Sequence, residues 1–157
     1  RIKEDPDKQG IFMFIDIDDF KKINDTYGHH VGDQYLIEFA NWLRALPIEN
    51  TIHMRIAGDE FGLFTYGLTQ VDEEYKKAYW TLIKKNLLTK PFTVEGQQLF
   101  FSFSGGIAVY GIDTCEIYEL IEYADGAMYK AKKKRKNKMA SYSKLDNKKP
   151  TKEQKWN

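Results

Sequence analysis

The chain of 157 residues is 42% apolar and 15% aromatic, which is enough to bury the core of one globular domain. Its formal net charge of +1 gives no electrostatic reason to expect a nucleic-acid partner. A single cysteine, Cys115, excludes an internal disulfide. No apolar run is long enough to cross a bilayer and no signal peptide opens the chain, so we expect a cytoplasmic domain, even if the full-length protein is membrane-anchored.

The beginning of the chain predicts one strand followed by two helices. The continuous apolar run 11–15 is typical of a buried central strand. Helical spacing of the next apolar residues predicts a short helix that Asp18 or Asp19 caps at its start. A second helix is expected to begin near Gly32 and to end before Pro47.

The middle of the chain predicts two pairs of strands separated by a helix. Strands at 51–56 and 61–66 flank a turn of small and acidic residues, which is typical of a hairpin. Helical spacing predicts a helix over 72–90, ended by a proline. Strands at 92–94 and 99–110 are then expected on either side of a glycine-containing turn.

The last predicted element is a long helix with Asp113 as its N-cap and an apolar stripe from 117 to 131. After Lys138 the chain becomes polar and rich in lysine. We therefore expect a domain over 1–140 and a polar tail or linker over 141–157. The order of elements predicts an α+β fold, with a central, mainly antiparallel sheet flanked by helices.

Carboxylates follow the first strand and occupy the tip of the hairpin. Asp16 and Asp18 come directly after the strand, and Asp59 and Glu60 form the turn. If the hairpin pairs beside the first strand, these side chains converge at one edge of the sheet and suit a hard cation such as Mg²⁺. Such a metal can orient a triphosphate and activate a hydroxyl. For either cluster alone, a solvated acidic turn is the commoner explanation.

The start of the first helix is a candidate phosphate site. A helix that begins right after a buried strand directs backbone N–H groups and a positive dipole end toward whatever lies there. Lys21 or Lys22 could add charge, although an ordinary surface lysine explains Lys22 better.

Two polar side chains near the predicted first and second helices could together recognise guanine. The amide of Asn24 and the carboxylate of Asp33 complement the acceptors and donors on the guanine edge, and adenine lacks those donors. The alternative is that Asn24 is a helix-end residue and Asp33 a helix cap.

Seven Lys or Arg residues fall within 130–138, at the end of the last helix. A solvated helix end explains them most simply, because cations are favoured at a helix C-terminus. Nucleic-acid binding is disfavoured, since only Tyr129 lies among them as a stacking aromatic. Lys132 is the best placed to neutralise a bound phosphate, because it directly follows the apolar stripe.

Four segments, in order along the chain, resemble the motifs of GGDEF domains. Residues 14–33 resemble "DxDxFKxINDxxGHxxGD", and 55–61 resemble the signature "RxGGDEF". Residues 104–108 resemble "SxGIA", and 124–132 resemble "ADxALYxAK". Together the matches span residues 12–137, which makes coincidence a poor explanation.

This resemblance implies a fold similar to the palm of nucleotidyl cyclases and some polymerases. It also implies a diguanylate cyclase, which condenses two GTP molecules into cyclic di-GMP and releases pyrophosphate. The implied cofactor is Mg²⁺, with Mn²⁺ as a substitute. Each subunit would hold one GTP, so the implied catalytic unit is a homodimer, and fusion to a sensor or other regulatory domain is expected. No nucleic acid is implied as a partner.

The resemblance also implies roles for individual residues. Asp16, Asp59 and the carbonyl of Ile17 would hold the metal. Asp59 would also act as the base toward the ribose 3′-hydroxyl, and Glu60 would support the metal site. The implied substrate-binding residues contact the base, the nucleotide site and the phosphates: Asn24 and Asp33, then His29, then the backbone of Asp19, Phe20 and Lys21 with the side chains of Lys132 and Lys136.

Three departures from the family pattern leave an alternative open. Ala57 replaces the first glycine of the signature, and Lys136 stands where the family has arginine, so a bidentate phosphate contact becomes a point charge. The family's opening segment, "DxLTGLxNR", is missing apart from Arg1. The alternative is a catalytically degenerate GGDEF domain that binds GTP as a regulatory sensor module.

The family's product-inhibition motif, "RxxD", is also absent. The aligned positions begin with Ile48 and end with Thr51, and neither side chain carries a charge that could hold cyclic di-GMP. We therefore expect no product feedback through this route.

Overall fold

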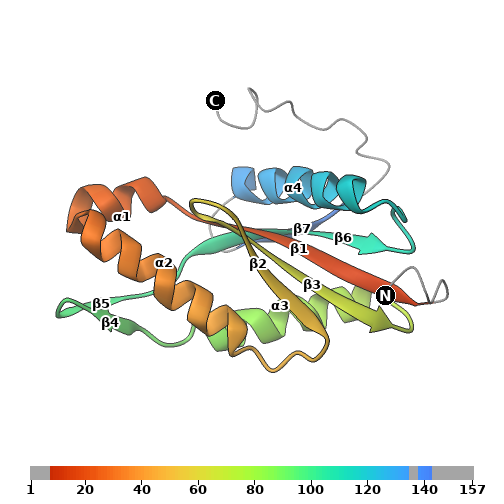
Figure 1. The fold of residues 1–157 in the computed structure, drawn as a ribbon, viewed down its shortest axis with the longest axis horizontal. Coiled ribbons are helices and arrows are strands. Elements are labelled where there is room, and N and C mark those ends of the chain that lie inside the picture. Colours follow the sequence, from red (N-terminus) through yellow and green to blue (C-terminus); the bar gives the residue numbers. More distant parts are fainter. Residues whose placement is uncertain (1–7, 135–137, 143–157) are drawn as a thin grey trace.

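The computed structural model describes residues 8–134 and 138–142 of the chain. Its centre is a five-stranded sheet with the order β2-β3-β1-β6-β7 (Figure 1). All neighbouring strands are antiparallel except β6 and β7, which are parallel. The strands are β1 (Gln9–Ile17), β2 (Thr51–Ala57), β3 (Glu60–Leu68), β6 (Phe103–Tyr110) and β7 (Met139–Ser141). The predicted α+β fold with a mainly antiparallel sheet is confirmed.

Helices cover both faces of this sheet (Figure 1). Helix α4 (Ile117–Lys134) packs on one face, and α2 (His29–Arg44) and α3 (Glu73–Leu87) pack on the other. The short helix α1 (Phe20–Tyr27) packs against α2. A separate two-stranded sheet pairs β4 (Phe92–Val94) with β5 (Gln97–Leu99). None of the helices within the described residues is both long and apolar enough to cross a membrane.

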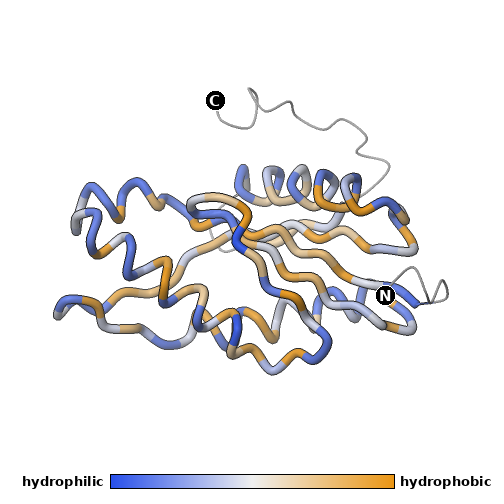
Figure 2. The backbone as a smooth tube through the Cα atoms, in the orientation of Figure 1, coloured by the Kyte–Doolittle hydropathy of each residue, from blue (hydrophilic) through white to orange (hydrophobic). Residues whose placement is uncertain are grey.

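Strand β1 is apolar throughout because each of its faces is covered by helices. Ile11, Met13 and Ile15 pack into the core beneath α2 and α3. Phe12 and Phe14 point to the opposite face, into the core beneath α4. In Figure 2 the central strands are accordingly coloured mostly as hydrophobic. This two-sided burial explains why the sequence shows a continuous apolar run here rather than an alternating one.

Helix α4 approaches the sheet very closely at Gly106 in β6. A Cβ atom at this position would collide with the backbone of Ala124 and Met128. The absence of a side chain therefore lets the helix backbone rest directly on the strand, which fixes where the C-terminal part of α4 lies relative to β1.

The second helix differs from its predicted start. It begins at His29 instead of near Gly32, so that only Gly28 separates it from α1. Gly32 lies inside α2 because the two helices are in close contact there: a Cβ atom at Gly32 would collide with Oδ1 of Asn24. The glycine that suggested a helix start from the sequence is required by helix packing instead.

Two further predictions are corrected. The expected strand 99–110 is interrupted and forms parts of β5 and β6. Asp113 does not cap α4, because its Oδ2 accepts a hydrogen bond from the backbone of Val109, 2.7 Å away. At the start of α4, Glu116 instead accepts from the backbone of Tyr118. Past residue 138 the chain adds the short strand β7 to the edge of the main sheet, beside β6.

Candidate active site

The pairing of β1 with β3 brings the two predicted acidic clusters together. Asp16 lies directly opposite Glu60 in the register of these strands. The backbone N–H of Ile17 donates to the carbonyl of Asp59 over 3.1 Å. Asp59, at the hairpin turn, is therefore held beside the end of β1. Asp59 and Glu60, which follow Asp16 by 43 and 44 positions in the sequence, thus meet it at one end of the central strand.

Asp16 is the buried centre of this group, with only 3% of its surface exposed. Its Oδ2 accepts a hydrogen bond from Nζ of Lys132 over 2.7 Å, whereas Oδ1 is buried and has no hydrogen-bond partner among the described residues. The pKa of Asp16 is raised from 3.8 to about 7. Burial is the largest cause; the hydrogen bond and charge of Lys132 oppose the rise, and the negative charges of Asp59 and Glu60 add to it. The site therefore concentrates negative charge that a cation would relieve.

Asp18, two positions after Asp16 in the chain, is also buried. Its two carboxylate oxygens accept hydrogen bonds from the hydroxyls of Ser102, over 3.0 Å, and Ser104, over 2.7 Å. Its backbone N–H donates to the carbonyl of Ser102. The Asp18 carboxylate thus ties the end of β1 to Ser104 in β6 and to Ser102, just before that strand. The sequence offered no signal for these two serines beyond the "SxGIA" match.

The turn from β1 into α1 places the start of a helix next to Asp16. Asp19 adopts a left-handed backbone conformation, with φ 52°, and α1 begins at Phe20. The predicted side-chain cap is not formed, because Asp19 makes no capping hydrogen bond and the Asp18 carboxylate is engaged by the serines. The backbone N–H groups in the first turn of α1, including that of Lys21, therefore have no side-chain cap. The side chains of Lys21 and Lys22 are exposed.

Lys132 reaches the carboxylates from α4, on the other side of β1. Its Nζ lies 2.7 Å from Asp16 Oδ2 and 3.4 Å from the carbonyl oxygen of Ile17. The side chain remains 33% exposed, so it is not enclosed by the protein. Lys136, the other predicted phosphate ligand on this segment, lies outside the described residues.

The predicted base-recognition residues lie where α1 meets α2. Oδ1 of Asn24 is buried and has no hydrogen-bond partner among the described residues. Asp33 and His29 are exposed on the first turns of α2. Asp33 does not cap this helix, which begins four residues earlier, so the capping alternative is wrong. The exposed carboxylate of Asp33 and the buried, unpartnered amide oxygen of Asn24 are thus both found on the two helices that meet at Gly28.

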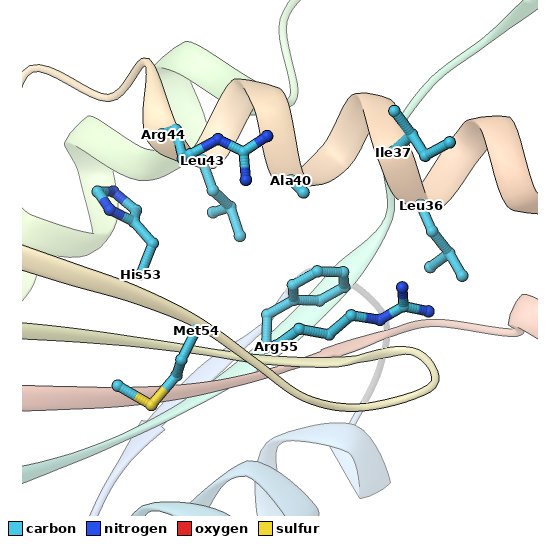
Figure 3. Close-up of a pocket in the computed structure, with 9 residues that line it drawn as sticks. Leu36, Ile37, Ala40, Leu43, Arg44, His53, Met54 and Arg55 are labelled. Atoms are coloured by element: carbon cyan, nitrogen blue, oxygen red, sulfur yellow. The ribbon is translucent and has the colours of Figure 1, made fainter.

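The hairpin turn that carries Asp59 is fastened by Arg55. Its guanidinium donates two hydrogen bonds to the carbonyl of Gly58, over 3.0 and 2.7 Å, and lies 5.9 Å from the centre of the Phe61 ring. A pocket of about 310 Å³ opens beside this arginine, between α2 and β2, with Arg44 on its opposite side (Figure 3). Arg55 opens the signature match, but the sequence alone indicates no role for its side chain.

The donors at the end of β1 fit a divalent metal ion in kind. Carboxylate and carbonyl oxygens are the ligands that Mg²⁺ prefers, and Asp16 Oδ1 is a buried oxygen without another partner. Within residues 8–134 and 138–142, however, no three His, Cys, Asp or Glu side chains are already grouped as a metal site. Part of the coordination would therefore come from the Ile17 carbonyl and from a bound ligand or water.

A model of the GGDEF domain, described as a diguanylate cyclase domain, matches residues 1–138. The chain belongs to the GGDEF family. It is 37% identical over 134 residues to the bifunctional diguanylate cyclase/cyclic di-GMP phosphodiesterase MucR of Pseudomonas aeruginosa, covering 83% of the chain but only 18% of MucR.

Solved GGDEF structures share this fold. The GGDEF domain of PA1120 from Pseudomonas aeruginosa is 28% identical, with a TM-score of 0.77 over 90% of this chain and 86% of that one. An EAL/GGDEF domain protein from M. capsulatus is 34% identical, with a TM-score of 0.76 over 86% and 85% of the two chains. The expected cyclase palm-like fold is thereby confirmed for this GGDEF domain.

The substitution in the GGDEF signature is accommodated without backbone strain. Neither Ala57 nor Gly58 adopts a positive φ in this domain, so the turn does not require a glycine at position 57. Gly58 has open space around the position of a Cβ atom. Ala57 therefore gives no structural reason to expect a distorted hairpin.

The positions aligned with "RxxD" take part in packing and in local hydrogen bonds. Ile48 packs against the core, and the hydroxyl of Thr51 lies 2.8 Å from that of Thr65 and donates to the carbonyl of Glu49. Thr65 in turn shares a hydrogen bond with the hydroxyl of Tyr79. In this GGDEF domain the segment is thus part of a hydrogen-bonded link between β2, β3 and α3.

Proposed function

We propose that this domain is a diguanylate cyclase, which joins two GTP molecules into cyclic di-GMP and releases pyrophosphate with Mg²⁺ or Mn²⁺ as cofactor. The observation that carries the proposal is the register of β1 and β3, which sets Asp16 opposite Glu60 and holds Asp59 against Ile17. Carboxylates gathered at the end of one strand can hold the divalent ion that metal-dependent phosphoryl transfer uses, which supports the proposal. Membership of the family supports it but does not decide it, since relatives such as MucR also carry a phosphodiesterase in their names.

Asp16, Asp59 and the Ile17 carbonyl would hold the metal, with Glu60 supporting the site. When bound there, a divalent cation supplies charge to orient the triphosphate and to lower the pKa of the ribose 3′-hydroxyl. Asp59 would accept the proton of that hydroxyl. Its position on a fastened turn supports this role, because Arg55 and the Ile17 N–H fix the backbone on both sides of it.

The substrate would lie between the helix junction and the end of β1. Asn24 and Asp33 would recognise guanine, and the buried, unsatisfied Oδ1 of Asn24 supports this assignment because such an oxygen requires a donor. His29 would lie beside the nucleotide. The phosphates would extend over the backbone of Asp19, Phe20 and Lys21 toward the side chain of Lys132, with Lys136 adding charge.

The reaction requires two chains. Each would hold one GTP, and both 3′-hydroxyls must attack in line, so we propose a homodimer with the two sites face to face. Since the chain spans 18% of the length of MucR, we also propose that this domain is joined to a sensor or other regulatory domain.

The test is to incubate the purified protein with GTP and Mg²⁺ and to look for cyclic di-GMP and pyrophosphate by chromatography and mass spectrometry. Formation of both products, lost when the metal is chelated, is the expected result. GTP binding without either product, under conditions where the protein is dimeric, would contradict the proposal. It would support the degenerate sensor module instead.

A further inference from the structure

The ammonium group of Lys132 contacts one oxygen from each of two residues that would hold the metal. Its Nζ is 2.7 Å from Asp16 Oδ2 and 3.4 Å from the carbonyl oxygen of Ile17. These two atoms come from adjacent residues at the end of β1 and belong to the metal ligands proposed above. A divalent ion bound to both of them would take the space and the charge position of this ammonium.

The location of Asp16 explains why a cation is held there. The carboxylate is buried, with 5% of its side chain exposed, and Asp59 and Glu60 add further negative charge nearby. A buried carboxylate without a counter-ion is strongly disfavoured. Lys132 supplies that counter-ion from a helix whose backbone is fixed against β6.

The lysine can also leave. One third of its side chain is exposed, and a lysine ammonium is a point charge on a flexible stem, with no planar geometry that must be preserved. Among the residues that the structure describes, its Nζ contacts Asp16 and Ile17. Moving the ammonium away requires no change in the backbone of α4.

We propose that Lys132 is a placeholder cation: its ammonium occupies the metal position on Asp16 and Ile17, and it moves onto the phosphates only when the metal arrives together with the nucleotide. This inference rests on the proposed function of the site. A metal ion without nucleotide must displace the ammonium of Lys132 from Asp16 and offers it no other anion, so the metal ion binds weakly. The metal–nucleotide complex brings phosphates that accept the ammonium, so metal and nucleotide bind cooperatively.

The experiment measures Mn²⁺ binding to the nucleotide-free protein by electron paramagnetic resonance, which detects free Mn²⁺ directly. Wild type is compared with Lys132→Met, which keeps the apolar stem, and with Lys132→Gln in case the first variant folds poorly. Lys133→Met is the matched control, because it removes the same charge from an exposed neighbour on the same helix. Circular dichroism melting checks that each variant is folded.

We expect Lys132→Met and Lys132→Gln to bind Mn²⁺ about tenfold more tightly than wild type, and Lys133→Met to bind like wild type. Adding Asp16→Asn to Lys132→Met should abolish the gain. With a non-hydrolysable GTP analogue present, wild type should gain more Mn²⁺ affinity than Lys132→Met does.

Equal or weaker Mn²⁺ binding by both folded Lys132 variants would overturn the inference, as would an equal gain in Lys133→Met. The readout needs no turnover, so it is independent of the cyclase assay. If wild type makes cyclic di-GMP but the Lys132 variants bind Mn²⁺ as wild type does, the placeholder role of Lys132 is rejected and the cyclase proposal stands. Tighter Mn²⁺ binding in a protein that never makes product would reject the cyclase alone.

Discussion

Asp16 in β1 lies directly opposite Glu60 in β3, although 43 residues separate them in the sequence. The next residue of β1 extends this contact, because the backbone N–H of Ile17 donates a hydrogen bond to the carbonyl of Asp59. The site is therefore built on backbone pairing, and changes to its side chains should leave the sheet intact.

Replacing Asp59 by Asn should lower cyclic di-GMP formation about a hundredfold or more, because the variant loses a metal ligand and a general base together. The melting temperature should stay near that of wild type, since the turn contributes its backbone and not a core side chain. Glu74→Gln removes the same charge from the exposed side of α3 and should leave the rate unchanged. An active Asp59→Asn protein would exclude this residue from the mechanism.

Base selectivity should depend on Asp33. Its removal in Asp33→Ala should weaken GTP binding by about 1–3 kcal/mol, because guanine donors lose their acceptor, while ATP binding should change little. Titration calorimetry with both nucleotides measures the difference. Wild-type protein that binds ATP and GTP equally would show that Asn24 and Asp33 do not recognise guanine.

Gly32→Ala should also weaken GTP binding, although residue 32 lies within α2 and offers no side-chain group. The added methyl group collides with Oδ1 of Asn24 and must displace that amide. A double-mutant cycle with Asn24→Ala tests this cause, since the glycine change should have little further effect once the amide is absent. Full additivity of the two losses would mean that Gly32 acts in another way.

Without divalent metal, the stability of the protein should fall as the pH rises. Burial raises the pKa of Asp16 from 3.8 to about 7, so between these values the folded state binds more protons than the unfolded state. Stability is then lost across this window as the pH increases. Asp16→Asn removes the effect and should gain stability relative to wild type from pH 4 to pH 7. Urea denaturation at several pH values checks this, and parallel profiles for the two proteins would contradict it.

Added cyclic di-GMP should not inhibit the enzyme through the segment before β2. Ile48 and Thr51 lack the charges that would hold the product, and the Thr51 hydroxyl is already bonded to Thr65 and Glu49. Progress curves with micromolar product test this, together with calorimetry of product binding. Tight product binding that is lost in Glu49→Ala or Thr51→Ala would reveal a feedback site at this position.

Local patterns in the sequence determined most of the elements. The apolar run that became β1, the hairpin of β2 and β3, and the stripe of α4 are each encoded by the period of neighbouring residues. The motif residues Asp16, Asn24 and Asp59 could likewise be selected from the sequence, because their types and spacing match the family.

Only the tertiary structure decided which of these side chains meet. Asp16 and Asp18 are only two positions apart in the sequence, yet the Asp18 carboxylate accepts hydrogen bonds from two serines, whereas Asp16 lies opposite Glu60 and accepts one from Lys132. Lys132 contacts Asp16, 116 positions away in the sequence, because α4 packs closely on β6. This close packing is possible because Gly106 in β6 has no side chain. Such contacts depend on strand register and helix placement, which are set by the packing of the whole domain and leave no periodic signal in the chain.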